Sequence, residues 1–127
     1  MADKKIILAL DDVTMNLMLV KEALSKDFDV RIAKSGEMAL YVLGSAKVDL
    51  LLIDIDLPGM SGFDFLEHVR EIPMTKDIPA IFVTAHTTSG FILRAKNMGA
   101  VDYIAKPIQS DVLYQKVLQA LDMTDLD

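Results

Sequence analysis

Five side chains at four places in the sequence have the types needed to handle a phosphoryl group. The acids Asp11 and Asp12 follow one short apolar run, Asp54 follows a second, and Thr84 and Lys106 each follow a further one. Three carboxylates at one point repel one another unless a cation joins them or their pKa values rise. Carboxylate oxygens together with water are ligands that suit Mg²⁺. A lysine ammonium and a threonine hydroxyl can hold phosphoryl oxygens in place.

Each of these features also has an ordinary structural explanation. An acid pair after a strand is commonly a solvated turn or a helix cap, and an Asp shortly before Pro-Gly is commonly part of a turn. A threonine in a strand, or a lysine before a proline, says little by itself. The functional interpretation therefore depends on whether the five side chains end successive strands at one edge of a single sheet.

Five short apolar segments predict β-strands. Four of them are short, continuous and rich in apolar residues, which is typical of strands buried on both faces; they cover residues 6–10, 48–53, 80–83 and 103–105. The remaining segment, residues 28–33, alternates apolar and polar side chains and predicts a half-exposed edge strand.

Between these strands, apolar residues recur at the spacing of a helix. Ser35 and Ser61 are predicted N-caps, and Gly44 and Gly99 fall near predicted helix ends. The helix positions expected to face the core are Leu17, Val20 and Leu24, then Ala39, Val42, Leu43 and Ala46, then Phe65, Leu66, Val69 and Ile72, then Phe91, Ile92, Ala95 and Met98, and finally Val112, Leu113, Val117, Ala120 and Leu121, with Lys116 at the margin.

A strand–helix unit repeated five times predicts a doubly wound α/β fold, in which helices cover both faces of a parallel sheet. The edge character of the second strand favours the flavodoxin-like strand order 2-1-3-4-5. Ligands of such sheets bind beyond the carboxyl ends of the strands, where the strand order reverses. We expect the five side chains named first, those of Asp11, Asp12, Asp54, Thr84 and Lys106, to lie at that place. No linker or repeat interrupts the pattern, so we expect one domain over residues 1–127.

Composition excludes several classes of function. The chain has no cysteine, which excludes disulfides and thiolate chemistry and fits a reducing cytoplasm. No apolar stretch approaches the roughly 18 residues of a membrane span, and the start of the chain has no signal-peptide cleavage region. The net charge of −6 disfavours direct binding of nucleic acid. We therefore expect a cytoplasmic protein, and residues 122–127 are too few to form a further element.

Taken together, the motifs at these positions resemble the response-regulator receiver domain family. The resembling stretches are ILALDD at residues 7–12, DLLLIDIDLPGMSG at 49–62, PAIFVTA at 79–85 and GAVDYIAKP at 99–107. The resemblance implies two-component phosphorelay signalling by a phosphoacceptor domain rather than by an enzyme. A histidine kinase or a histidine phosphotransfer protein would donate the phosphoryl group, and an output partner would respond. The resemblance also suggests that the phosphorylated protein forms a dimer.

The same resemblance implies roles for the acids. Asp54 would be the phosphoacceptor. Asp11 and Asp12 would hold Mg²⁺ directly or through water, and Asp54 and the backbone carbonyl of Asp56 would complete the protein ligands. The side chain of Asp56, with His86, is expected to flank the path of the water that later removes the phosphoryl group.

Further roles follow for residues after the fourth and fifth strands. Thr84 and Lys106 would contact the phosphoryl oxygens. Tyr103 would be the aromatic that changes its exposure when Thr84 is drawn toward the phosphate, so the face made by the fourth helix, the fifth strand and the fifth helix is the expected output surface. Pro107 follows Lys106, commonly through a cis bond.

Three alternatives fit parts of the pattern. A degenerate receiver would act only as a docking module that needs no phosphorylation, although the complete set of five side chains speaks against this. A haloacid-dehalogenase-type phosphatase also uses an Asp-x-Asp motif such as Asp54 and Asp56, but it places this motif near the start of its fold and does not expect Pro58. A flavodoxin would bind a phosphate where Asp11 and Asp12 would repel it.

Overall fold

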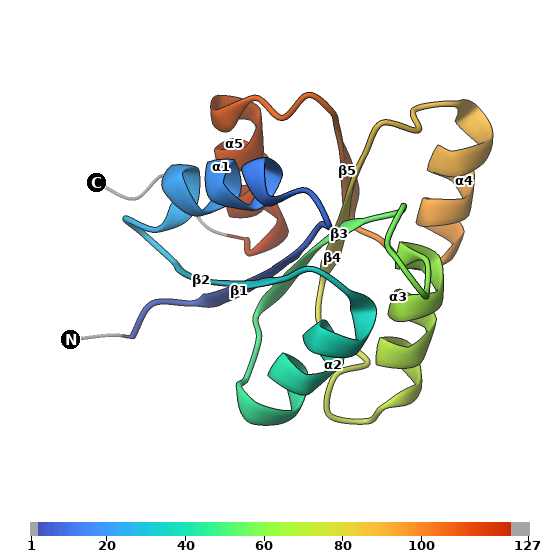
Figure 1. Cartoon of the computed structure of the whole chain (residues 1–127), viewed down its shortest axis with the longest axis horizontal. Helices are drawn as coiled ribbons and strands as arrows, with labels where there is room; N and C mark the ends of the chain where they lie inside the picture. Colours follow the sequence, from blue (N-terminus) through green and yellow to red (C-terminus); the bar gives the residue numbers. More distant parts are fainter. Residues whose placement is uncertain (1–2, 123–127) are drawn as a thin grey trace.

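A parallel sheet of five strands, with helices on both faces, forms the centre of the fold (Figure 1). The computed structural model describes residues 3–122, so the prediction for the last residues of the chain lies largely outside it. The strands are β1 (Ile6–Leu10), β2 (Asp29–Ala33), β3 (Leu50–Asp54), β4 (Ala80–Thr84) and β5 (Asp102–Ala105). The helices are α1 (Thr14–Leu24), α2 (Gly36–Ser45), α3 (Gly62–Glu71), α4 (Ser89–Asn97) and α5 (Ser110–Ala120).

The strand order is β2-β1-β3-β4-β5, which confirms the predicted topology. All neighbouring strands pair in parallel, and every strand is followed by a helix. Within residues 3–122, no helix combines the length and the apolarity that crossing a membrane requires.

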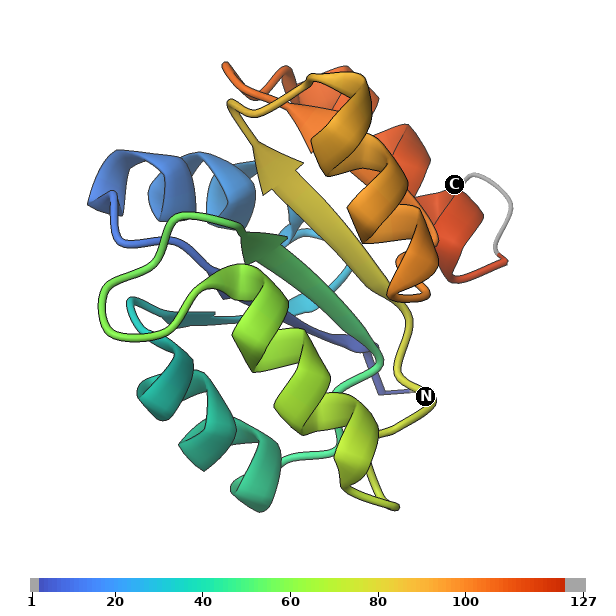
Figure 2. The same cartoon turned by 90° about the vertical axis from the view of Figure 1, so that its right-hand side faces the viewer.

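Two hydrophobic cores lie on opposite faces of the sheet. Ile7 and Leu50 face α1 and α5, whereas Leu8 and Leu51 face α2 and α3. Figures 1 and 2 show these layers, with α1 and α5 on one side and α2, α3 and α4 on the other. Because successive side chains of a strand point to opposite faces, burial on both faces requires apolar residues at every position. The continuous runs in β1, β3 and β4 are explained in this way.

The fifth strand departs from the prediction of a strand buried on both faces. It forms an edge of the sheet, where only Ile104 is fully buried, while Tyr103 is half-buried and Ala105 is exposed. The other edge strand, β2, buries Val30 and leaves Ile32 at 40% exposure. A short apolar run does not reveal whether its strand has neighbours on both sides, because that depends on the order in which strands pair.

Every helix buries some of the residues predicted to face the core, but not every predicted residue is buried. Leu17, Val20 and Leu24 of α1 are all buried, whereas Ile72 at the end of α3 and Val112 in the first turn of α5 are exposed. Residues outside the predicted faces are also buried, namely Phe63 in α3 and Leu118 in α5.

The predicted helix caps are confirmed. The Ser35 side chain accepts a hydrogen bond from the backbone N–H of Met38, and Ser61 forms a capping box with Asp64. Such caps satisfy N–H groups that have no partner inside the helix. Gly99 follows α4 with a φ of +85°, a left-handed conformation that glycine adopts without strain.

Candidate functional site

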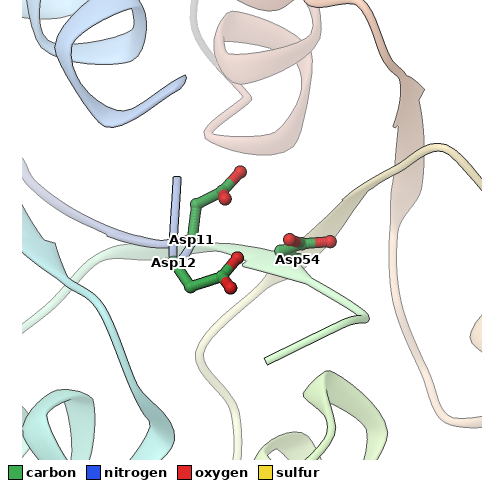
Figure 3. A group of neighbouring side chains, drawn as sticks. All are labelled: Asp11, Asp12 and Asp54. Atoms are coloured by element: carbon green, nitrogen blue, oxygen red, sulfur yellow. The ribbon is translucent and has the colours of Figure 1, made fainter. Parts of the chain in front are cut away.

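The structure brings four of the predicted site residues to the carboxyl edge of the sheet. Asp11 follows β1, Asp54 and Thr84 are the last residues of β3 and β4, and Lys106 follows β5. Figure 3 shows the side chains of Asp11, Asp12 and Asp54 next to one another at the ends of β1 and β3. One carboxylate oxygen from each of these three residues lies within 4.8 Å of the other two.

Lys106 is the cation at the centre of this cluster. Its Nζ lies 2.8 Å from Asp11 Oδ2 and 3.0 Å from Asp54 Oδ2. Both carboxylates are almost fully buried, each residue being 4% exposed. The backbone N–H of Lys106 donates to the carbonyl of Thr84, which continues the β4–β5 pairing by one residue. The predicted cis bond between Lys106 and Pro107 is confirmed.

The carboxylate of Asp11 is held in position by three donors. Its Oδ1 accepts a hydrogen bond from the backbone N–H of Val13, and its Oδ2 accepts one from the Asn16 amide at 3.0 Å in addition to the contact with Lys106. Asp12, by contrast, is exposed and has no hydrogen bond or ion pair with any residue in the described part of the chain. One carboxylate of the cluster is therefore fixed and another is open to a ligand.

This set of donors fits a hard divalent cation. Three carboxylates carry three negative charges, and within residues 3–122 Lys106 supplies the one positive charge in direct contact with them. The ligand atoms are all oxygen, and exposed Asp12 leaves room for the waters that Mg²⁺ retains in protein sites. Asp11, Asp12 and Asp54 can hold such an ion together.

Burial raises the pKa of Asp54 above its usual value, because a charged carboxylate loses its hydration there. The hydrogen bond and the charge of Lys106 lower this pKa but do not outweigh the burial, and the negative charge of Asp11 adds to the rise. For Lys106, burial lowers the pKa, but its hydrogen bonds to Asp11 and Asp54 more than offset this and leave the pKa raised.

In metal-free protein, replacing Asp54 by Asn is expected to raise the melting temperature near neutral pH. Because the folded-state pKa of Asp54 lies above its unfolded value, the charged form costs folding free energy at every pH above that folded-state pKa. As the pH falls through it, the folded protein takes up the proton first and the penalty disappears. Thermal unfolding in a chelator should show the advantage of the variant shrinking as the pH is lowered from neutral through this folded-state pKa. An advantage that does not change with pH would contradict this account.

The loops after β3 and β4 meet beside the cluster. The backbone N–H of Asp56 donates to Asp54 Oδ1 at 3.3 Å, and the backbone N–H of His86 donates to the Thr84 hydroxyl at 2.8 Å. The side chains of the same two loop residues also meet, with His86 Nε2 2.6 Å from Asp56 Oδ2. The side chains of His86 and Asp56 therefore meet across the loops that adjoin Asp54 and Thr84.

Tyr103 does not belong to this cluster. It pairs with Phe82 in the β4–β5 register and packs against the core on the α3 and α4 side, and its ring lies 5.3 Å from Lys116 Nζ. His68, the other histidine, is exposed on α3.

The first residue of α3 packs directly on the backbone of the site. A Cβ atom at Gly62 would overlap the carbonyl oxygen of Asp54, and the N–H of Gly62 donates to the carbonyl of Ile55. A glycine at this position lets the helix approach the end of β3. The sequence pattern does not reveal this requirement, nor the hydrogen bond from Asn16 to Asp11.

Replacing Gly62 by Ala is expected to destabilise the protein by about 1–3 kcal/mol, because the added Cβ would overlap the Asp54 backbone, which moves less easily than a side chain. It should also weaken Mg²⁺ binding, because β3 must shift at Asp54. The matched control is Gly44→Ala in α2, where a Cβ would meet nothing within 4 Å. That change should stabilise the protein by about 0.5–1 kcal/mol. Urea unfolding of both variants decides the matter, and equal effects would contradict the packing argument.

Comparisons with family models, curated proteins and solved structures all indicate similarity to response regulators. A family model described as the response regulator receiver domain matches residues 7–118. The chain is 37% identical to hybrid signal transduction histidine kinase I of Dictyostelium discoideum, over 92% of this chain and 7% of that protein. It is 34% identical to the signal transduction histidine-protein kinase BarA of Escherichia coli, over 89% of this chain and 12% of BarA.

A further relative is the response regulator PleD of Caulobacter vibrioides, which is 31% identical over 87% of this chain and 25% of its own length. The chain thus spans a quarter or less of these curated relatives.

Solved structures show the same similarity over the whole length of their chains. The chemotaxis response regulator CheY4 of Vibrio cholerae superposes with a TM-score of 0.88 at 27% identity, covering 93% of this chain and 99% of CheY4. A CheY-like receiver domain protein from Methanospirillum hungatei superposes with a TM-score of 0.86 at 30% identity, covering 94% of this chain and 95% of the other.

Proposed function

The chain belongs to the response regulator receiver domain family of two-component systems, and on that premise we propose that Asp54 accepts a phosphoryl group in a Mg²⁺-dependent reaction. We also propose that residues 1–127 form a single receiver domain that changes its surface when Asp54 is modified.

In the proposed reaction, a carboxylate oxygen of Asp54 attacks the phosphorus of a phosphohistidine on a histidine kinase or a histidine phosphotransfer protein. The bond from phosphorus to the imidazole nitrogen breaks, its electron pair stays on the imidazole, and an acyl phosphate forms on Asp54. Lys106 Nζ, 3.0 Å from Asp54 Oδ2, would pair with a phosphoryl oxygen, and the Thr84 hydroxyl would donate to another. Phosphoryl transfer needs mainly such positioning and charge neutralisation.

Mg²⁺ would be held by Asp11, Asp12, Asp54 and the backbone carbonyl of Asp56. When bound, the ion supplies positive charge against the phosphoryl oxygens and the acids. Hydrogen bonds from the Val13 N–H and the Asn16 amide hold the Asp11 carboxylate in position for this role.

One observation carries the proposal, namely a nearly buried Asp54 that ends β3 between Lys106 and two further acids. The test is incubation with acetyl phosphate, followed by intact-protein mass spectrometry. The mass is expected to increase by one phosphoryl group with Mg²⁺ present and to stay unchanged in a chelator. A protein that gains no phosphoryl group from either acetyl phosphate or a histidine phosphotransfer protein would refute the proposal.

A degenerate receiver that acts only as a docking module is the second candidate. Such a domain would have no need of a buried acid cluster with a lysine at its centre, whose unscreened charges cost folding free energy. The geometry therefore favours the phosphoacceptor.

We propose that the output surface, which would contact the partner, is the face formed by α4, β5 and α5. Tyr103 on β5 lies half-buried beside this face, so it can change its exposure. Leu93 on α4 and Val101 next to β5 are exposed, at 58% and 54%, and could contact an output partner or a second phosphorylated copy. A phosphoryl group must bind the active arrangement more tightly by roughly 10⁴-fold to carry it from a 1% to a 99% population.

The lifetime of the phosphoryl group is expected to depend on His86 and Asp56, whose side chains bridge the two loops that adjoin the site. His86→Ala and Asp56→Asn should each speed dephosphorylation several-fold, because the bridge that restricts the approach of water is lost. Both variants should still take up phosphate from acetyl phosphate. The decay of phosphorylated protein, followed by mass spectrometry after removal of the donor, measures the rates. Decay at the wild-type rate in both variants would exclude this role.

A further inference from the structure

His86 connects three parts of the molecule through three different atoms or faces. Its backbone N–H donates to the Thr84 hydroxyl at 2.8 Å, and its Nε2 lies 2.6 Å from Asp56 Oδ2. Its ring stacks on the ring of Phe91 in the first turn of α4, with centroids 4.4 Å apart and planes inclined by 18°. A single half-exposed residue thus touches the loop after β3, the end of β4 and α4.

The contact with α4 continues into α3. The ring of Phe91 stacks on Phe63 at 6.2 Å and 18°, and the Arg94 guanidinium lies 4.1 Å over the ring of Phe63. Stacked aromatic rings and cation–π contacts hold their partners in defined orientations. His86 is therefore the end of a continuous stack that reaches from the site to two turns of α4.

The rest of α4 is weakly attached. Among its residues, Ala95 is the one that is fully buried, and its N-cap, Thr88, makes no side-chain capping hydrogen bond. An uncapped helix with little buried surface has a low free energy of local opening. The stack of His86 on Phe91 therefore contributes to holding the first turn of α4 in place.

We propose that His86 is a latch, which holds α4 in its resting position and is released when the Thr84 hydroxyl moves toward a phosphoryl group on Asp54. Because the N–H of His86 is bound to that hydroxyl, a movement of Thr84 displaces the His86 backbone. The ring is then drawn from Asp56 and from Phe91, and α4 becomes free to shift. This inference rests on the proposed function for its trigger, whereas the resting contact of His86 with α4 stands without it.

The first experiment tests the resting contact in metal-free, unphosphorylated protein. Hydrogen exchange of the amides of residues 92–97, measured by mass spectrometry or NMR, should be about tenfold faster in His86→Ala than in wild type, since a ring stack and a partly exposed hydrogen bond are lost. His86→Phe, which keeps a ring against Phe91 and loses the contact with Asp56, should fall between the two. His68→Ala, at the exposed histidine of α3, is the matched control and should exchange as wild type does. Amides of β1 and β3 report whether the fold is intact.

The second experiment adds Mg²⁺ and beryllium trifluoride, a phosphoryl mimic, with its attachment at Asp54 followed by fluorine NMR. In wild type the mimic should speed exchange in α4, and in His86→Ala it should bind but add little further change. Equal exchange of α4 in His86→Ala and His68→Ala without the mimic would overturn the latch. An equal response of α4 to the mimic in wild type and His86→Ala would overturn it as well. If the mimic does not bind to wild type, the proposed function fails, and the first experiment still decides whether His86 holds α4.

Discussion

Asp54→Asn is expected to take up no detectable phosphoryl group under conditions in which wild type is fully modified. The Asn amide has almost the shape of the carboxylate but lacks the nucleophilic oxygen that must form the bond to phosphorus. The other acids cannot replace it easily, because Asp11 is fixed by Val13, Asn16 and Lys106, and exposed Asp12 faces solvent. Intact mass after incubation with acetyl phosphate and Mg²⁺ measures the effect.

The control for this loss is Asp77→Asn. Asp77 is an exposed acid in the loop before β4, at the opposite edge of the sheet, and its replacement should leave phosphorylation at the wild-type rate. Circular dichroism should show that the Asp54 variant is folded. A mass increase in Asp54→Asn equal to that of wild type would place the acceptor elsewhere in the chain.

The second large effect is expected on Mg²⁺ affinity. Asp11→Asn and Asp12→Asn should each weaken Mg²⁺ binding by at least about tenfold, because each removes a charged oxygen ligand. Titration calorimetry, or the metal-dependent rise in melting temperature, measures this affinity. Unchanged affinity in both variants would remove the pair from the metal site.

The two variants should differ in stability without metal. Mutual repulsion alone predicts that either replacement leaves stability level or raises it. We keep that expectation for Asp12, which is exposed and has no partner in the described part of the chain. Asp11 is buried and accepts from three donors, so its replacement should cost about 1–3 kcal/mol. A similar change in both variants would mean that the contacts of Asp11 contribute little.

The sequence predicts the fold and the position of the site for one physical reason. In a parallel sheet all carboxyl ends lie at one edge, so residues that follow strands in the sequence become neighbours in space. Asp11, Asp54, Thr84 and Lys106 are of this kind, and the structure brings them to that edge. The strand boundaries needed for this prediction differ from the observed ones by two residues or fewer.

The features that sequence reasoning missed are those that depend on how elements pack. The contact of Asn16 with Asp11 requires the path of the chain between β1 and α1, and the close approach of Gly62 to Asp54 requires the position of α3. The stack of His86 on Phe91 joins a loop to a helix that follows it and has no periodicity in the sequence. The partial exposure of β5, whose apolar run suggested burial on both faces, likewise follows from its edge place in the sheet rather than from composition.

The acid cluster lies at the carboxyl ends of the strands, so the opposite edge of the sheet is a suitable place for a reporter dye. The loop from α3 to β4 lies at that opposite edge, and within it Met74 is 92% exposed. Because the chain has no cysteine, Met74→Cys creates a single thiol that a maleimide can label at one known position. A second cysteine in α4, at exposed Leu93, would complete a donor–acceptor pair whose separation reports the movement of α4 in real time.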